Sequence, residues 1–286
     1  MVNDMVSGRL KFLILIYVLA AVWLGGCSDS SEEVQEPRLV VEGQIDSDGY
    51  PRVFLTLSAT ADASGGIISE NIIRWGVVKL SDGENEVILT GGPMAGVLPP
   101  YIYYSYDMVG VPGRSYTLTA EYKDKKVTSE VTMPEPTEIE GVRISGNAAD
   151  DRSCDLTIMF TSPADAPAYY HLSVRVSGSD NRFYPCTPGT IAVMEGGKRV
   201  EMPVYKGNGG LSSGNDREGF TVGERVTVRL ARVAPEVYDF WRAWDNAALT
   251  GGSVFVGSSV SLPSNISGGY GVWSAQGVSD LDVEIQ

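Results

Sequence analysis

The sequence predicts a mainly β fold, with an N-terminal immunoglobulin-like β-sandwich at residues 38–135 and a second β-rich domain with one helix at 137–286. Two observations support this prediction. In both regions apolar residues alternate with more polar ones at a period of two, which is typical of half-buried strands. Short clusters of Asp, Ser, Gly and Pro separate these segments, as in Asp46-Ser47-Asp48-Gly49 and Ser81-Asp82-Gly83, and they predict turns.

The first domain holds seven predicted strands and no helical pattern, which is typical of an immunoglobulin-like sandwich. Pro112 to Ala120 looks like the tyrosine corner of such domains, in which a Tyr hydroxyl bonds to nearby backbone. Tyr116 is therefore expected to be structural. Pro134-Glu135-Pro136 ends the last strand and stiffens the chain, so we place the domain boundary there. The predicted strands lie around Leu39–Val41, Val53–Leu57, Trp75–Leu80, Glu86–Thr90, Tyr101–Met108, Ser115–Tyr122 and Lys126–Thr132.

The second domain combines further strands with one helix at about 235–249. Pro235 suits a first helical position, and Gly251-Gly252 ends the segment. Apolar residues recur between them at spacings of three and four, which predicts an aromatic stripe that faces a core. The stripe is Val237, Phe240, Trp241, Trp244 and Ala248, and the strands lie around Ile139–Ser145, Cys154–Phe160, Tyr169–Ser177, Val200–Tyr205, Arg225–Arg232, Gly271–Val278 and Leu281–Ile285.

The N-terminus has the features of an export signal. Two basic residues precede an apolar run from Phe12 to Leu24, whose length of about 13 residues fits a signal-peptide core and is too short to span a bilayer. The run ends in Leu24-Gly25-Gly26-Cys27, which resembles a lipobox. The alternative is an ordinary small-residue cleavage site with an incidental Cys. We expect removal of residues 1–26 and attachment to the lipid bilayer through acylated Cys27.

Residues 27–37 are too polar to pack and predict a lipidated tether. In Bacteroidetes lipoproteins a short acidic stretch after the acylated Cys marks export to the outer face of the outer membrane. Ser28-Asp29 followed by Glu32-Glu33 looks like such a signal. We therefore expect an outer-membrane location, with the folded part facing the cell exterior.

Charge and cysteine content restrict the partners further. The chain carries 36 acidic and 22 basic side chains, a formal net charge of −14, which repels nucleic acid and argues against it as a partner. With Cys27 acylated, only Cys154 and Cys186 remain. In an exported protein the two could form a disulfide, or both could be buried free thiols, and the sequence leaves both alternatives open.

No catalytic, metal-binding or cofactor-binding group of residues is expected. Gly210-Leu211-Ser212-Ser213-Gly214 fits the pattern of a nucleophile elbow but lies in a polar Gly-rich loop rather than between a strand and a helix. His171 is the single histidine, and its apolar strand favours a satisfied structural role. One His cannot supply a zinc site without carboxylates. Asp46 and Asp48 lack the downstream ligands of a calcium loop.

Four tyrosines in six residues form the most suggestive binding feature. Tyr101, Tyr103, Tyr104 and Tyr106 could present rings to a ligand or a partner protein. The alternative is a strand that carries Tyr on both faces of a sheet, which the strand preference of tyrosine favours.

Several segments carry a resemblance to a known family. They resemble the markers of a Bacteroidetes lipoprotein family known as a numbered domain of unknown function, over nearly the whole chain after the signal. The resemblance implies an outer-membrane lipoprotein often encoded beside a TonB-dependent receptor, without established chemistry. Trp273 departs from the aromatic residue expected at its position, and Val142 to Asn215 carries no marker. The matching segments are Leu39–Ile45, Pro112–Ala120, Met133-Pro134, Tyr238–Trp244 and Asn265–Trp273.

These observations together favour a non-enzymatic role. We expect a surface lipoprotein that acts as an accessory or ligand-capture subunit of a TonB-dependent transporter. Two alternatives remain from the sequence: a surface glycan hydrolase that uses two carboxylates, or a structural or adhesive surface protein.

Overall fold

A computed structural model describes residues 36–58, 71–97, 99–147, 150–165, 167–180, 182–207, 219–249 and 262–286. The predicted signal peptide, Cys27 and the tether up to residue 35 lie outside the described residues. So does most of the Gly-rich loop, at 208–218.

The described part of the chain is built mainly from strands, with one helix, α2 (Pro235–Leu249), as the sequence predicts. The helix has the predicted bounds. No helix in the described ranges is long and apolar enough to cross a membrane. The strands are β1 (Leu39–Asp46), β2 (Arg52–Leu57), β3 (Val77–Ser81), β4 (Glu86–Ile88), β5 (Thr90–Pro93), β6 (Tyr101–Tyr104), β7 (Ser115–Tyr122), β8 (Lys125–Thr132), β9 (Gly141–Asn147), β10 (Asp150–Thr161), β11 (Ala168–Val176), β12 (Tyr184–Val193), β13 (Arg199–Val204), β14 (Phe220–Thr221), β15 (Arg225–Val233) and β16 (Tyr270–Glu284).

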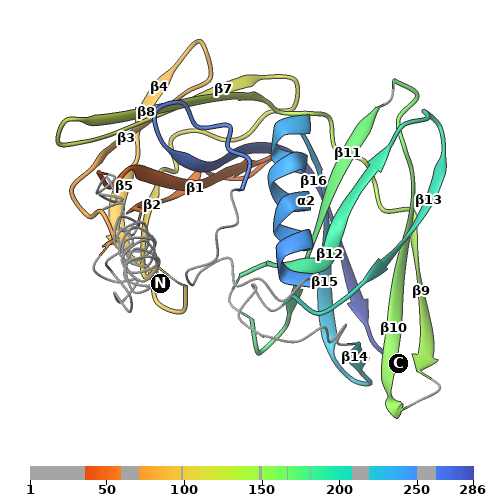
Figure 1. The fold of residues 1–286 in the computed structure, drawn as a ribbon. Coiled ribbons are helices and arrows are strands. Elements are labelled where there is room, and N and C mark those ends of the chain that lie inside the picture. The colour runs from red at the N-terminus through yellow and green to blue at the C-terminus, as the bar shows by residue number, and fades with distance from the viewer. Residues whose placement is uncertain are drawn as a thin grey trace, which may run out of the picture. The chain divides into compact units, whose positions relative to one another are not determined.

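Three sheets form sandwich-like layers (Figure 1). The largest has eight strands in the order β12-β11-β15-β16-β1-β2-β6-β5. One smaller sheet, β4-β3-β7-β8, packs on the β1–β2 part of it, and the other, β13-β10-β14 with β9 beside β10, packs on the β11–β15 part. Alternation along the strands sends the apolar side chains of the large sheet into these two cores, as the period of two requires.

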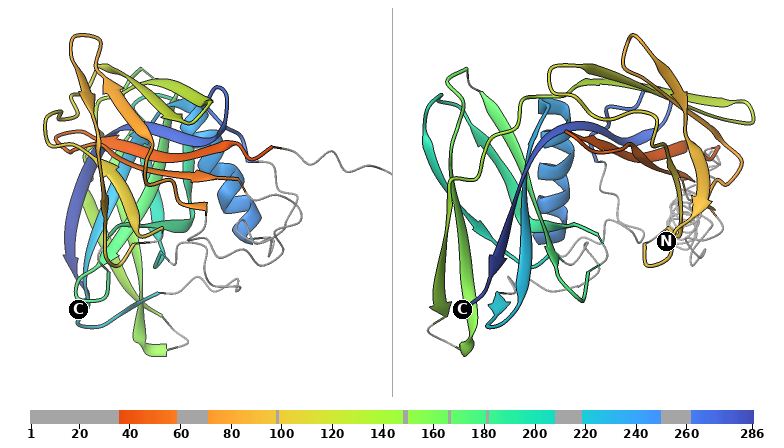
Figure 2. Two further views of the ribbon diagram at one scale, coloured as in Figure 1. Left: turned by 90° about the vertical axis from the view of Figure 1, so that its left-hand side faces the viewer. Right: turned by 180° about the vertical axis from the view of Figure 1, so that it is seen from behind.

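Strand β16 joins the two parts of the fold. Its first half pairs with β1 in parallel, from Val40↔Tyr270 to Asp46↔Gln276. Its second half pairs with β15 in antiparallel fashion, up to Arg225↔Glu284. Figure 2 shows it as the long blue strand that continues from one part into the other. The large sheet therefore crosses the expected boundary at Pro134–Pro136, and the end of the chain completes the first core.

The tightest packing of this joint surrounds Trp273, which is fully buried. Its indole N–H donates to the carbonyl oxygen of Tyr116 at 3.1 Å. A Cβ atom on Gly43 would come within 2.9 Å of the indole ring, so glycine is required there. Gly271 has φ +111, and a Cβ on it would overlap the carbonyl of Val41. Asn265 fixes the same strand because its side chain bonds both backbone groups of Trp273, at 2.7 and 2.9 Å.

Helix α2 covers the opposite face of the large sheet, against β11, β12 and β16 (Figure 1). Its first turn begins where the Ala234 carbonyl accepts the N–H groups of Val237 and Tyr238. Val237 and Phe240 are buried, in a cluster with Ala231, Val233 and Val272. This confirms for these positions that the stripe faces a core.

Tyr116 forms the predicted corner. Its hydroxyl accepts the Val111 N–H at 2.7 Å and donates to the Val109 carbonyl at 3.4 Å. Burial raises the pKa of the phenol above its ordinary value. The structural role predicted for Tyr116 is confirmed.

Candidate functional site

The tyrosine-rich segment forms β6, and its side chains point to both faces of the sheet. Tyr103 is only 2% exposed. Its hydroxyl donates to the Ile73 carbonyl at 2.9 Å and accepts the Gly76 N–H at 2.9 Å, and burial raises its pKa. Tyr101 donates to the Arg74 carbonyl at 3.0 Å. Of the four tyrosines that could present rings to a partner, Tyr103 is therefore not accessible, because its ring and hydroxyl are used inside the protein.

These two tyrosines hold the segment Ile73–Gly76 in place. The three hydrogen bonds lie on both sides of Trp75, whose side chain is 88% exposed. The neighbouring glycine allows this close contact, because a Cβ on Gly91 would lie 2.6 Å from the Tyr101 hydroxyl. The sequence predicted a strand that starts at Trp75 and gave no signal that its ring is presented to solvent.

Three exposed apolar side chains lie on β3, on its neighbour β4 or just before β3, and we call them the Trp75 patch: Trp75, Val77 and Ile88. The latter two are 44% and 64% exposed and lie on the outer face of the β4-β3-β7-β8 sheet. Two ion pairs border the patch, Lys79–Glu86 at 3.1 Å and Lys126–Glu121 at 2.9 Å. The hydrogen bond from Lys126 holds the pKa of Glu121 below its ordinary value.

A second exposed aromatic group lies on the large sheet. Tyr106 is 70% exposed and packs edge-on against Tyr104 and Tyr50, with ring centroids 5.4 and 5.0 Å away. We call Tyr50, Tyr104 and Tyr106 the tyrosine cluster. Arg52 lies opposite Tyr104 in the register of β2 and β6. Of the four candidate contact tyrosines, Tyr106 is exposed, Tyr104 and Tyr101 are half-buried, and the sequence did not identify Tyr50 as a neighbour of Tyr104 and Tyr106.

A polar network lies beside the tyrosine cluster and is centred on the buried carboxylate of Asp46. One oxygen accepts from Gln44 and Gln276, at 2.9 and 2.6 Å, and the other from Arg52 and Arg229, at 3.1 and 2.7 Å. With four donors its oxygens are occupied. Asp46 therefore ties β1, β2, β15 and β16 together rather than binding a ligand.

The acidic terminal strand contributes to the same network. Asp280 forms two 2.7 Å bonds to Arg229, and Asp282 accepts the Thr227 hydroxyl at 2.7 Å. The Arg229 guanidinium also stacks over Phe183, 3.9 Å from the ring centroid. Each of these two acids therefore has a partner on β15.

His171 is buried, as its apolar strand predicts, and stacks on Trp241 with centroids 4.2 Å apart. Burial lowers its pKa to about 3. Its Nε2 has no hydrogen-bond partner among the described residues, so the expected satisfied histidine is not formed at that atom. No group of three or more His, Cys, Asp or Glu in the described ranges is placed to hold a metal ion.

Cys154 and Cys186 are both buried free thiols, so the disulfide alternative is wrong. Cys154 lies on β10 of a smaller sheet and Cys186 on β12 of the large sheet. Burial raises the pKa of Cys186 to about 12.

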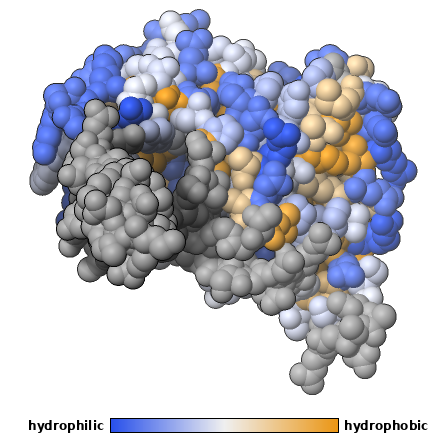
Figure 3. Space-filling view, viewed as in Figure 1, coloured by the Kyte–Doolittle hydropathy of each residue, from blue (hydrophilic) through white to orange (hydrophobic). Residues whose placement is uncertain are grey.

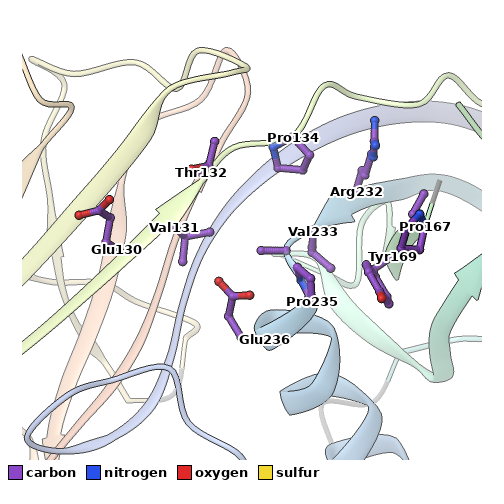
Figure 4. A pocket seen from close by; sticks show the side chains of 12 residues that line it. Glu130, Val131, Thr132, Pro134, Pro167, Tyr169, Arg232, Val233, Pro235 and Glu236 are labelled. Carbon is purple, nitrogen blue, oxygen red and sulfur yellow. The ribbon is translucent and has the colours of Figure 1, made fainter. Parts of the chain in front are cut away.

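A cleft of about 500 Å³ lies between β8 and the start of α2 (Figure 4). Glu130 and Glu236 both line it, with Arg232 and Tyr169. Two facing carboxylates here would support a glycan hydrolase. However, the Glu130 carboxylate accepts the Thr117 hydroxyl at 3.2 Å on the outer face of the sheet. Glu130 therefore has a structural partner on β7.

The comparison with known families gives one match. Residues 28–281 match the family described as Domain of unknown function (DUF4249), and the chain therefore belongs to this family. No curated protein matches the chain.

Proposed function

We propose that this member of the family is a lipid-anchored outer-membrane protein, facing the cell exterior, that assists a TonB-dependent transporter without being an enzyme. In this role it captures a ligand or hands it to the transporter. Acylated Cys27 holds it to the bilayer, and the polar segment that follows acts as a tether.

The observation that carries the proposal is the exposed tyrosine cluster. Large aromatic side chains with a polar hydroxyl are enriched at protein interfaces and often provide much of the binding energy. Tyr106 and Tyr50 are exposed, yet they are held by ring contacts with each other and with Tyr104. A preorganised aromatic surface loses little side-chain freedom on binding, which favours association.

The position of the cluster fits a tethered protein. The chain enters the fold at the start of β1, and the tyrosine cluster lies at its other end, where Gln44 pairs with Arg52 and Arg52 with Tyr104. Five residues of strand between Leu39 and Gln44 place the cluster about 17 Å from the entry point. A tether of about ten residues extends up to roughly 35 Å, which suffices to bring the cluster to the rim of a neighbouring receptor.

Three acids that a hydrolase could use have structural bonds instead. Asp46 and Asp280 bind arginines, and the Glu130 carboxylate bonds to a threonine. These contacts support a binding role over the hydrolase alternative.

The test is recovery of the protein from native membranes in mild detergent. We expect a TonB-dependent receptor to co-purify with it. Tyr50→Ser combined with Tyr106→Ser should lower the recovered receptor about tenfold or more, since aromatic hot spots are worth at least about 2 kcal/mol. The matched control is Tyr270→Ser, which removes an exposed tyrosine outside the cluster and should leave recovery unchanged.

Two results would contradict the proposal. One is recovery of the protein alone from membranes that contain the adjacent receptor. The other is a fatty-acid label that persists in the Cys27→Ala variant, because the lipid would then not be attached at Cys27. Unchanged receptor recovery in the double variant would reject the tyrosine cluster as the contact.

A further inference from the structure

Trp75 is held in an exposed position and is not free to pack against the rest of the protein. Tryptophan is the residue with the largest apolar surface, and it gains most from leaving water. The backbone on both sides of Trp75 is fixed by the hydroxyls of Tyr101 and Tyr103, through three hydrogen bonds. The ring therefore keeps its exposed position, which is expected where something other than the protein covers it.

The patch is too small to carry a stable protein interface. With exposures of 88%, 44% and 64%, its three side chains offer on the order of 400 Å² of surface. A stable interface buries about 800 Å² on each partner. The surrounding β7–β8 surface is mostly hydrophilic and adds little apolar area (Figure 3). Insertion into a lipid surface has no such minimum, because single aromatic side chains already settle at headgroup depth.

Charge also favours this face over others. The chain carries a net charge of −14, so most of its surface is repelled by acidic headgroups. Beside the Trp75 patch the charges compensate each other in the pairs Lys79–Glu86 and Lys126–Glu121. Because these bordering charges compensate each other, the patch can approach lipid headgroups with less repulsion than the rest of the acidic surface.

The patch lies close to the point where the tether enters the fold. Arg38 bonds Ser58 through two hydrogen bonds, and Val40 pairs with Thr56. Thr56 in turn bridges Ile72, and the three residues from Ile72 to Trp75 span at most about 11 Å. The point where the chain enters the fold and the patch therefore lie at the same end of the described residues.

From exposure, size, charge and position together, we infer that the Trp75 patch rests on the lipid surface to which the tether holds the chain. This inference depends on the proposed lipid anchor at Cys27. It fixes the orientation of the protein: the Trp75 patch faces the headgroups, and the tyrosine cluster at the other end of β1 faces away from the membrane.

The experiment uses the full acylated protein, reconstituted into phosphatidylcholine vesicles with ordinary or brominated acyl chains. The difference in fluorescence between the wild type and Trp75→Phe isolates the emission of Trp75. We expect brominated lipid to reduce this emission about twofold or more, because Trp prefers headgroup depth, and we expect aqueous iodide to leave it nearly unchanged.

A matched control moves the reporter to the other end of β1. In the Trp75→Phe background, Tyr106→Trp places an exposed indole in the tyrosine cluster. Its emission should show the reverse pattern, with quenching by iodide and none by brominated lipid.

Each other outcome overturns the inference in a recognisable way. Quenching of Trp75 by iodide alone means that the patch faces water, and quenching by neither agent means that protein, such as a second copy, covers it. In both cases, flotation of the protein with the vesicles would show that the lipid anchor still holds. Failure to float rejects the anchor itself, and the orientation with it.

Discussion

Replacement of Trp273 by Phe tests whether the end of the chain completes the first core. The indole is fully buried, contacts Gly43 and donates its N–H to the Tyr116 carbonyl at 3.1 Å. Phe keeps an aromatic ring on β16 but removes the donor and part of the ring. The change therefore probes the joint without deleting it.

The expected loss of stability follows from these two contacts. The lost hydrogen bond contributes about 1 kcal/mol, and the Tyr116 carbonyl is left without that donor. The indole has two more ring carbons than the phenyl group, which at about 0.8 kcal/mol per buried carbon gives about 1.6 kcal/mol. Trp273→Phe should therefore lower the free energy of unfolding by about 2 to 3 kcal/mol.

Urea denaturation followed by circular dichroism measures this loss. With a slope of about 3 kcal/mol per molar, the midpoint should fall by about 0.7 to 1 M at unchanged slope. Trp75→Phe makes the same chemical change at an exposed site and should stay within about 0.5 kcal/mol of the wild type. Equal losses in the two variants would refute the assignment of Trp273 as a core residue of the joint.

Three further predictions concern buried groups. Burial lowers the pKa of His171 to about 3, so between about pH 6.5 and 3 this histidine is protonated in the unfolded chain and neutral in the folded one. As the pH falls through that window, the free energy of unfolding should decrease by up to about 1.4 kcal/mol per pH unit. His171→Phe should flatten this dependence in urea titrations at pH 7 and 4.5, and an unchanged slope would contradict it. Intact mass should be the same with and without reductant, and Cys154 and Cys186 should resist alkylation until the protein is denatured; a mass shift on reduction would show a disulfide. Tyr116→Phe should cost about 1 kcal/mol in thermal or urea unfolding, since it removes the hydroxyl that accepts the Val111 N–H, and no loss would argue against the corner.

Local patterns in the sequence were sufficient for the elements that depend on near neighbours. The helix at Pro235–Leu249 follows from a proline at its start and apolar spacings of three and four. The role of Tyr116 follows from a partner only five residues away. Strand periodicity likewise placed β7 and β8 at nearly their observed bounds.

Long-range pairing could not be read in this way. The sequence pattern of β16 is the same whether it pairs within a second domain or beside β1, some 230 residues earlier, and only tertiary packing decides. The sequence pattern is equally insufficient to decide which face of β6 is buried. Period two predicts that Tyr103 and Tyr104 point to opposite sides, but it does not say which side is buried. The exposure of Trp75 depends on hydrogen bonds from Tyr101 and Tyr103 that no local pattern predicts.

Two of the segments that resemble family markers form the joint between β1 and β16. The opening segment of β1 and the Asn265-to-Trp273 segment resemble family markers, and the fold brings them side by side as parallel strands. The joint gives β1 a neighbour on each side, β16 and β2, so the first strand after the tether is a central strand and not an edge. A force transmitted along a tether from the membrane would therefore act on a strand bonded along both sides. The same strand also runs between the two ends that the proposals distinguish: its start lies near the Trp75 patch through Thr56, and its end lies near the tyrosine cluster through Arg52.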